Sequence, residues 1–352
     1  MIDRGFWRGR RVLVTGHTGF KGSWLSLWLA RCGAQVTGLA LPPTATPNLH
    51  SLARVGDHLS GHSCDVRDAE ATDAVVRVAK PEVVFHLAAQ ALVRVGYREP
   101  VTTFATNVMG TVNVLDALRS LDGVRAVVVV TTDKVYRNHE WVHPYREPDE
   151  LGGTDPYGAS KAASELVVSS YRQAFCAMRG LALASARAGN VVGGGDWSED
   201  RLLPDAVRAW SRNEVLQLRN PKATRPWQHV LEPLAGYLVL AQRLWHEPAL
   251  AEAWNFAPAA EGTADVATVV GLAAACWPGA RVHHGSDDPA APEAGWLALD
   301  GAKARMRLGI RPVWTLTQTV QRTMHWYRAQ RDGTSARDLC EGDIRAYEAA
   351  LG

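Results

Sequence analysis

The stretch RVLVTGHTGFKGSW, residues 11–24, decides the fold that this sequence predicts. Its first residues, 11–14, form a short apolar run that is typical of a buried strand. The next segment carries glycines at positions 16, 19 and 22, and residues 23–30 have the low polar content of a buried helix. Strand, glycine turn and helix in this order form a dinucleotide-binding unit, in which the pyrophosphate rests on the helix N-terminus.

A glycine turn also joins ordinary strands and helices, so the turn alone leaves both interpretations open. Tyr157 and Lys161 favour the dinucleotide site. The two residues are four apart, so on a helix their side chains lie one turn apart on the same face. A lysine ammonium beside a phenol favours the phenolate, which makes the tyrosine a usable base near neutral pH.

Three polar residues, Thr132, Asp133 and Lys134, follow an apolar run over 126–130 that indicates a buried strand. They would add a hydroxyl, a carboxylate and an amine to the cleft that holds the tyrosine. A single hydride transfer needs only the tyrosine. The additional groups therefore predict more than one chemical step on one substrate.

The second predicted strand, residues 34–40, leaves the choice of cofactor open. An acidic residue near the end of this strand usually binds the ribose 2′-hydroxyl of NAD, and an arginine accommodates the 2′-phosphate of NADP. Here the strand runs into Leu41-Pro42-Pro43, with neither residue type at its end.

Two further segments are candidates for the cofactor site. Asp65 and Val66 form an acidic–apolar pair suited to an adenine contact, although Asp65 or Asp68 could instead cap a helix. The strand predicted over 82–90 ends in small residues that let a ribose approach the backbone, while His86 within this strand is more typical of packing.

Asn107 lies inside a helix predicted over 102–118. Its amide would serve either a structural contact or a proton relay. The outer face of this helix and that of a second predicted helix, 157–171, either pair across a two-fold axis or face solvent.

After residue 187 the regular alternation of strands and helices ends. We therefore expect an α/β protein with a Rossmann-type doubly wound parallel sheet and a smaller C-terminal substrate-binding lobe. Residues 1–187 would form the NAD-binding domain with the catalytic residues, and 188–352 mainly the lobe, with some segments returning to the sheet. Arg201, Arg219 and Arg225 are candidate ligands of a diphosphate, although each alone could be a surface charge.

Composition excludes several classes of protein. A net charge of +2 over 352 residues gives no case for a nucleic-acid or membrane-surface partner. The five cysteines are far apart and none has metal-ligand spacing, so we expect reduced thiols, a cytoplasmic location and no metal. No apolar run approaches the length of a membrane span.

The glycine spacing, Tyr157 and Lys161 resemble the extended short-chain dehydrogenase/reductase superfamily. Longer blocks are similar, more narrowly, to the CDP-glucose 4,6-dehydratase family, and the resemblance covers nearly the whole chain. Asp133-Lys134 stands where the related dTDP-glucose dehydratases carry Asp-Glu. The blocks that carry the resemblance are 16–24, 132–136, 155–157, 193–197 and 219–230.

The resemblance implies a redox-neutral dehydration on tightly held NAD. Tyr157 would take the C4 hydroxyl proton, Lys161 would lower the tyrosine pKa and hold the nicotinamide ribose, and Thr132 would bind the substrate near C4. Asp133 would be the acid for the C6 hydroxyl, and Lys134 the base for C5, unless its charge only holds Asp133 in place. The implied cofactor-binding residues are Gly16, Thr18, Gly19, Phe20, Lys21, Gly22, Asp65, Val66, Leu87, Ala88, Ala89, Asn107, Tyr157 and Lys161. The implied substrate-binding residues are Gln90, Asn190, Arg201, Arg219, Arg225 and His229.

The family resemblance further implies a CDP-glucose substrate, deoxysugar biosynthesis for lipopolysaccharide O-antigen, and a homodimer or homotetramer. Two positions depart from the family pattern: Gly158 follows the tyrosine where a serine is expected, and Pro292 precedes Glu293-Ala294 where a histidine is expected. A 4-epimerase, a dehydratase of another nucleotide sugar, or a non-enzymatic NAD-sensing protein are the alternatives. The Asp133-Lys134 pair argues against an epimerase, and the presence of Tyr157 with Lys161 argues against a sensor.

Overall fold

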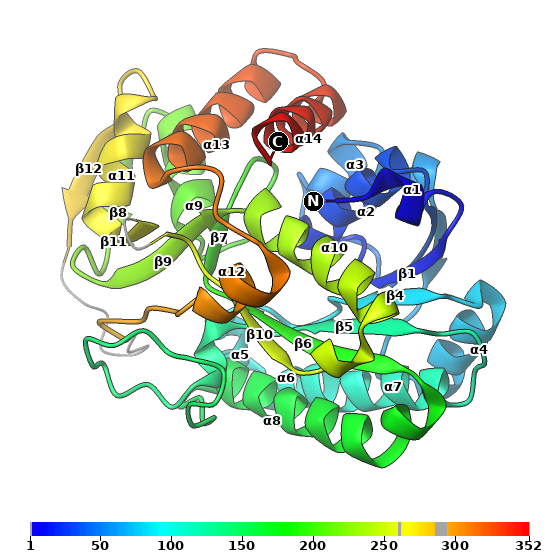
Figure 1. The fold of residues 1–352 in the computed structure, drawn as a ribbon. Coiled ribbons are helices and arrows are strands. Elements are labelled where there is room, and N and C mark those ends of the chain that lie inside the picture. Colours follow the sequence, from blue (N-terminus) through cyan, green and yellow to red (C-terminus); the bar gives the residue numbers. More distant parts are fainter. Residues whose placement is uncertain (1, 260–261, 286–293, 352) are drawn as a thin grey trace.

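Seven parallel strands form the central sheet of the computed structural model, which describes residues 2–259, 262–285 and 294–351 (Figure 1). The strand order is β10-β6-β5-β4-β1-β2-β3, and every neighbouring pair is parallel. These strands are β1 Arg11–Thr15, β2 Gln35–Ala40, β3 Ser60–Ser63, β4 Val83–His86, β5 Ala126–Val130, β6 Ala182–Ala188 and β10 Ala253–Phe256. The predicted Rossmann-type doubly wound sheet is confirmed.

Helices cover both faces of this sheet, and each face has its own apolar core (Figure 1). Val12 and Val14 of β1 enter one core, and Leu13 between them enters the other, because successive strand side chains point to opposite faces. The helices on the first face are α2 Phe20–Arg31 and α10 Leu231–His246; those on the second are α4 Ala69–Ala79, α7 Gly110–Arg119 and α8 Pro156–Tyr171.

Two smaller sheets follow the sixth strand of the chain. One has the order β11-β9-β7 and the other pairs β12 with β8. Their strands are β7 Asn190–Val192, β8 Val215–Leu218, β9 Thr224–His229, β11 Thr263–Asp265 and β12 Arg281–His284. The remaining helices are α1 Arg4–Trp7, α3 Leu49–Leu52, α5 Val93–Arg98, α6 Pro100–Phe104, α9 Leu202–Ser211, α11 Val266–Ala275, α12 Ala302–Leu308, α13 Leu316–Arg331 and α14 Ala336–Leu351.

The helix expected over 102–118 is interrupted. It is formed by α6, one π-helical turn over Ala105–Met109, and α7. The turn contains Asn107, which has no exposed surface. A π turn of this kind is frequent at functional sites, because it redirects one side chain without ending the helix. The capping box at the start of α13, Thr315 with Gln318, is as predicted.

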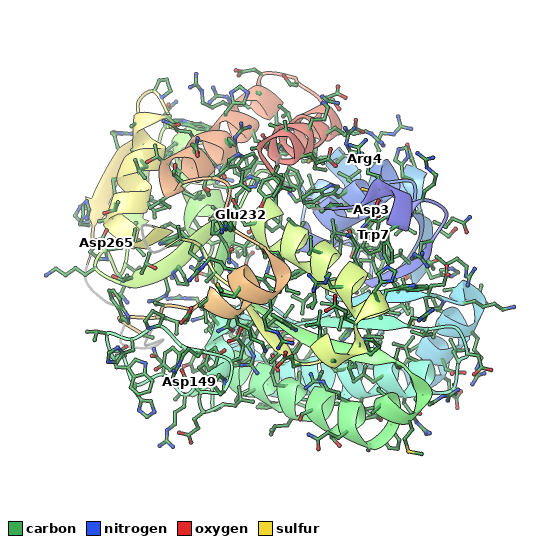
Figure 2. The ribbon with its side chains drawn as sticks, in the orientation of Figure 1. Asp3, Arg4, Trp7, Asp149, Glu232 and Asp265 are labelled. Atoms are coloured by element: carbon green, nitrogen blue, oxygen red, sulfur yellow. The ribbon has the colours of Figure 1, made fainter. Side chains whose placement is uncertain are left out.

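A buried carboxylate attaches the C-terminal segments to α10, on the first face of the central sheet. Glu232 of α10, labelled in Figure 2, accepts hydrogen bonds from the backbone N–H groups of Val313 and Trp314 and from the Tyr347 hydroxyl of α14. No helix in the described part of the chain is long and apolar enough to cross a membrane.

Gly22, in the first turn of α2, lies against the backbone of the glycine turn. A Cβ at this position would lie 2.0 Å from the Gly16 carbonyl oxygen. We expect Gly22→Ala to lower the free energy of unfolding by about 2 kcal/mol, since overpacking against backbone atoms outweighs the gain of about 1 kcal/mol in helix propensity. Gly19→Ala is the control, because its Cβ would meet the same oxygen at 3.4 Å. Equal urea midpoints for the two variants would contradict this close-packing argument.

Candidate active site

The glycine turn forms a cradle at the carboxyl end of β1. Gly16 has a φ of 75°, and a Cβ on it would lie 2.7 Å from the Ala88 amide nitrogen. Only glycine fits such a position without strain. At the start of α2, the N-cap residue Gly19 makes no side-chain capping bond. The first N–H groups of this helix therefore have no capping side chain, which suits a pyrophosphate.

The other candidate cofactor residues surround this cradle. The Thr15 hydroxyl accepts hydrogen bonds from the Leu87 and Ala88 amides at 3.1 Å, which fixes the end of β4 beside the turn. Ala89 follows directly. Thr18 donates to the Leu41 carbonyl at 2.9 Å beyond β2.

Asp68, not Asp65, caps α4. The Asp65 carboxylate binds the Arg67 guanidinium at 2.5 and 2.9 Å, which holds the pKa of Asp65 below its usual range. Val66 packs against Gly110 at the start of α7, where a Cβ would approach its side chain to 2.7 Å. The predicted packing role of His86 is confirmed, since its ring is buried between the Thr15 and Thr111 hydroxyls.

Asn107 and Gln90 use their side chains within the protein. The Asn107 amide donates to the Gln90 carbonyl and to the Ser160 hydroxyl, and its oxygen accepts from the Gln90 N–H. The Gln90 amide donates to Leu92 and Thr103 and accepts from the Leu92 N–H. Both residues thus join the end of β4 to helices α5 to α8 rather than presenting a free amide to a ligand.

Thr132, Asp133 and Tyr157 meet at the carboxyl end of β5. The Thr132 hydroxyl donates to Asp133 Oδ1 at 2.9 Å and lies near enough to the Tyr157 phenol to oppose the rise in its pKa. Burial raises the pKa of Asp133, although Lys134, Thr132 and Arg225 oppose the effect. Its Oδ2 is buried and has no hydrogen-bond partner among the described residues. A raised pKa favours the protonated form of the carboxyl, which is the form that an acid needs.

The tyrosine and the lysine both lie on the buried face of α8. Burial raises the pKa of Tyr157 to about 12, against the Thr132 hydrogen bond and the charge of Arg201. Lys161 Nζ donates to the Val130 carbonyl at 3.1 Å. Burial lowers the pKa of Lys161 to about 8, against the nearby Glu165 carboxylate. Activation of the phenol by Lys161 therefore stays a prediction, and the groups that oppose the rise in the Tyr157 pKa are Thr132 and Arg201.

Lys161→Met is expected to abolish activity and yet to stabilise the fold. With a pKa near 8 instead of 10.5, the protonated amine costs the folded state about 3 kcal/mol at pH 7. Loss of the bond to the Val130 carbonyl offsets about 1 kcal/mol. The net gain should be about 2 kcal/mol.

The gain should depend on pH with a defined sign. Between pH 8 and 10.5 the unfolded state binds more protons than the folded state, so the wild type gains stability as pH rises. The advantage of Lys161→Met should therefore be complete below pH 8, vanish near pH 10 and reverse above it, where only the loss of the bond to the Val130 carbonyl remains. Urea unfolding at pH 7 and at pH 10 measures it; a variant less stable than the wild type at pH 7 would contradict the prediction.

Lys134 lies in the 3₁₀ turn Asp133–Val135 and is half-buried. The absence of a serine after the tyrosine has a steric reason at this turn. A Cβ on Gly158 would lie 2.8 Å from the Lys134 carbonyl oxygen and 3.0 Å from Asp155. Glycine therefore lets α8 approach the acid–base turn closely. The second departure, at Pro292 and Glu293, lies outside the described residues.

Two arginines of the substrate set lie near the catalytic groups. The charge of Arg201 acts on both Tyr157 and Lys21, and helps to lower the pKa of Lys21 to about 8 after the larger effect of burial. Arg225 is buried, and its charge acts on Asp133. Arg219 is half-exposed and binds Asp200 at 3.0 Å. Asn190 opens β7, next to Trp227 of β9.

The expectation that His229 binds substrate does not fit its position and is corrected. The residue has no exposed surface, and its ring packs against Trp24 and Trp314. Its Nδ1 accepts from the Leu231 N–H, and burial lowers its pKa to about 3. His229 therefore belongs to the core between α2 and the C-terminal segments.

A buried ion pair behind the site was missed from the sequence. Glu165 of α8 and Arg187 of β6 make two hydrogen bonds to each other at 2.9 Å. The available signal was spacing, because Tyr157, Lys161 and Glu165 recur every four residues and so share one helix face.

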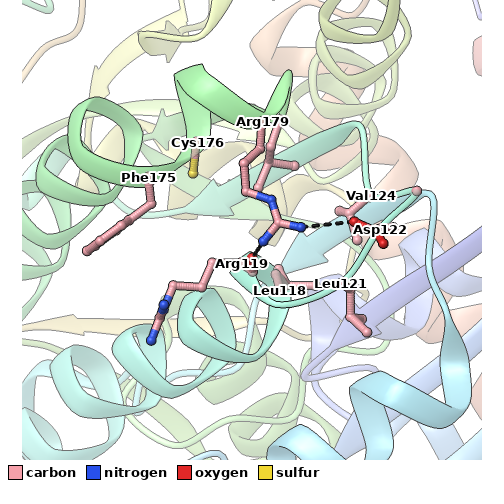
Figure 3. A pocket seen from close by; sticks show the side chains of 10 residues that line it. Leu118, Arg119, Leu121, Asp122, Val124, Phe175, Cys176 and Arg179 are labelled. Atoms are coloured by element: carbon pink, nitrogen blue, oxygen red, sulfur yellow. Dashed lines mark hydrogen bonds and ion pairs between the residues drawn. The ribbon is translucent and has the colours of Figure 1, made fainter.

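A cavity of about 60 Å³ lies at the opposite end of α7, away from these residues. Figure 3 shows that Arg179 crosses it to Asp122, beside Cys176 and Phe175. No group of three or more His, Cys, Asp or Glu side chains within residues 2–259, 262–285 and 294–351 is arranged to hold a metal ion.

Comparison with known proteins places the chain among enzymes that act on nucleotide sugars. The family described as GDP-mannose 4,6 dehydratase matches residues 13–323, and the chain belongs to that family. It is 46% identical to the CDP-glucose 4,6-dehydratase of Salmonella typhimurium over 358 residues, 99% of each chain.

Solved structures of related enzymes share the fold. A dTDP-glucose 4,6-dehydratase from Streptomyces venezuelae with bound NAD superimposes with a TM-score of 0.78 at 26% identity, over 92% of this chain and 98% of that one. A UDP-glucose 4-epimerase from Thermus thermophilus in complex with NAD also gives 0.78 at 26% identity, over 90% and 99%. The fold alone therefore does not separate dehydratase from epimerase.

Proposed function

We propose that the chain catalyses the conversion of CDP-glucose to CDP-4-keto-6-deoxyglucose and water, with NAD as internal hydride carrier. The observation that carries the proposal is the buried Asp133 carboxyl, which has Lys134 next to it and accepts a hydrogen bond from the Thr132 hydroxyl. The full-length similarity to a CDP-glucose 4,6-dehydratase supports the nucleotide.

The glycine cradle at the start of α2 fits a dinucleotide, since the uncapped N–H groups of the helix can bind a pyrophosphate. Bound NAD would accept a hydride from C4 of the sugar and return it to C6. Lys161 would hold the nicotinamide ribose.

The protein residues would move the protons. Tyr157 would take the proton of the C4 hydroxyl as hydride leaves C4; together these losses give a ketone at C4, which makes the C5 proton acidic. Lys134, in its neutral form, takes the C5 proton, and Asp133 gives its own proton to the C6 hydroxyl, which leaves as water. The C5 proton then returns as hydride reaches C6, so the reaction is redox-neutral.

The substrate lobe supplies cations for the diphosphate. Arg201 and Arg225 are proposed to bind it, since both lie near the catalytic groups and carry planar guanidinium forks. Arg219 would join them after leaving Asp200.

We also propose that the protein is a homo-oligomer of the cytoplasm, acting in deoxysugar biosynthesis. The helices predicted to pair across a two-fold axis expose Phe104, Met109 and Leu166 on their outer faces. Exposed apolar side chains in such number favour an interface over a solvated surface. Light scattering of the purified protein would measure its mass.

The test is an assay of purified protein and NAD with CDP-glucose, dTDP-glucose and UDP-glucose in separate reactions. Mass spectrometry would detect loss of one water. Water loss from CDP-glucose alone is expected. Interconversion of the C4 epimers without water loss would support an epimerase instead.

A further inference from the structure

A buried hydrogen-bond network joins the two halves of the candidate site. Its centre is the Arg187 guanidinium, whose Nε and Nη2 donate to the two Glu165 oxygens at 2.9 Å. The Glu165 carboxylate also accepts from the hydroxyls of Thr131 and Ser185, each at 2.6 Å. Four donors thus fix this one carboxylate, which lies one helical turn beyond Lys161 on α8.

The network also reaches the far side of the acid–base turn. Arg187 Nη1 donates to the Tyr136 hydroxyl at 2.8 Å, and that hydroxyl donates to Asn255 Oδ1 at 2.7 Å. Thr131 immediately precedes the segment 132–135, and Tyr136 immediately follows it. The segment that carries Asp133 and Lys134 is therefore held at both flanks against the helix that carries Tyr157 and Lys161.

Burial makes these bonds hard to replace. Glu165, Arg187 and Tyr136 are 4%, 3% and 1% exposed, so water cannot take the place of a lost partner. The Tyr136 ring is held independently of its hydroxyl, since it stacks on Tyr145 with centroids 5.1 Å apart and lies 5.0 Å from the Arg187 guanidinium. Removal of the hydroxyl alone would loosen the turn without removing the ring.

We propose that Arg187 and the Tyr136 hydroxyl are positioning residues for the water-elimination half of the reaction. They hold Asp133 and Lys134 at C6 and C5 of the same sugar whose C4 faces Tyr157. The two halves of the reaction depend on them unequally. C4 oxidation uses Tyr157 and Thr132, whereas Lys134 lies two residues before Tyr136, whose hydroxyl is linked to α8 through Arg187 and Glu165. This inference rests on the proposed function.

Tyr136→Phe tests the inference. We expect turnover to CDP-4-keto-6-deoxyglucose to fall about ten-fold or more, because misplacement by a fraction of an ångström is costly for aligned proton transfer. The rate of C4 oxidation, followed as NADH formation in a single turnover, should change less than about two-fold. NADH should therefore accumulate in the variant and not in the wild type.

Tyr145→Phe is the matched control. It removes a hydroxyl from the stacked partner ring, and among the described residues that hydroxyl binds Asn138 and His139 of the nearby loop. Both rates should stay at wild-type values. Arg187→Lys keeps the buried positive charge but loses the planar guanidinium that binds Glu165 and Tyr136. It should show the same accumulation of NADH, and it tests the inference if Tyr136→Phe does not fold.

Equal loss of both rates in the variants would mean a merely structural role and would overturn the inference, as would unchanged dehydration. Failure of the wild type to release water from CDP-glucose is a different result. It would refute the proposed function, and it is read from the wild type alone.

Discussion

A Tyr157→Phe variant is expected to bind NAD and CDP-glucose but to form NADH about 10²–10⁴-fold more slowly than the wild type. The phenol is the group proposed to take the C4 hydroxyl proton, and it is buried. Without this base, hydride leaves C4 much more slowly, and the later steps cannot begin until the C4 ketone has formed.

The defect should be chemical and not structural. Phenylalanine fills the same space, and the free energy of unfolding should stay within about 1 kcal/mol of the wild type. Single-turnover formation of NADH measures the first step, and equilibrium dialysis measures cofactor binding.

Tyr171→Phe on the same helix is the control, since within the described part of the chain that hydroxyl makes a 3.4 Å bond to Asp116 at the surface. Rapid NADH formation by Tyr157→Phe would assign the base to another residue.

Local signals predicted the parts of the fold that local chemistry determines. The β1–turn–α2 unit follows from apolar residues and glycines that are close in sequence, and the Thr315–Gln318 capping box from two residues three apart. Tyr157 and Lys161 follow from helical spacing in the same way. Each of these patterns contains its own physical reason, so the sequence was sufficient.

The sequence did not predict the roles of residues whose partners are distant in the chain. His229 ends a strand whose last five residues are all buried, so no alternation marks which side chains face the cleft. Its neighbours Trp24 and Trp314 are far away in the chain. In the sequence, Arg187 and Glu165 look like separate charged residues, and it is the packing of β6 against α8 that makes them a buried ion pair. The sequence also could not show that Asn107 sits in a π turn.

The second large effect is expected from Lys134→Met, which should permit C4 oxidation but stop water loss. If Lys134 is the C5 base, the variant should form NADH at the wild-type rate and then stall, with dehydration about 10²–10⁴-fold slower. In D₂O it should incorporate no deuterium at C5, because the C5 proton never leaves. NADH absorbance and mass spectrometry of the sugar nucleotide measure the two events in one reaction. Lys80→Met, an exposed lysine beyond α4, is the control.

Lys134→Arg separates a base from a mere charge. The charge of Lys134 acts on Asp133, opposing the rise in the pKa of that carboxyl, so the lysine could serve by holding Asp133 in place. An arginine keeps the positive charge but stays protonated at every usable pH, and so cannot accept the C5 proton. Loss of dehydration in both variants assigns the base to Lys134. Dehydration retained by Lys134→Arg and lost by Lys134→Met would assign only the charge, and C5 deprotonation would then belong to another group near the Asp133–Val135 turn.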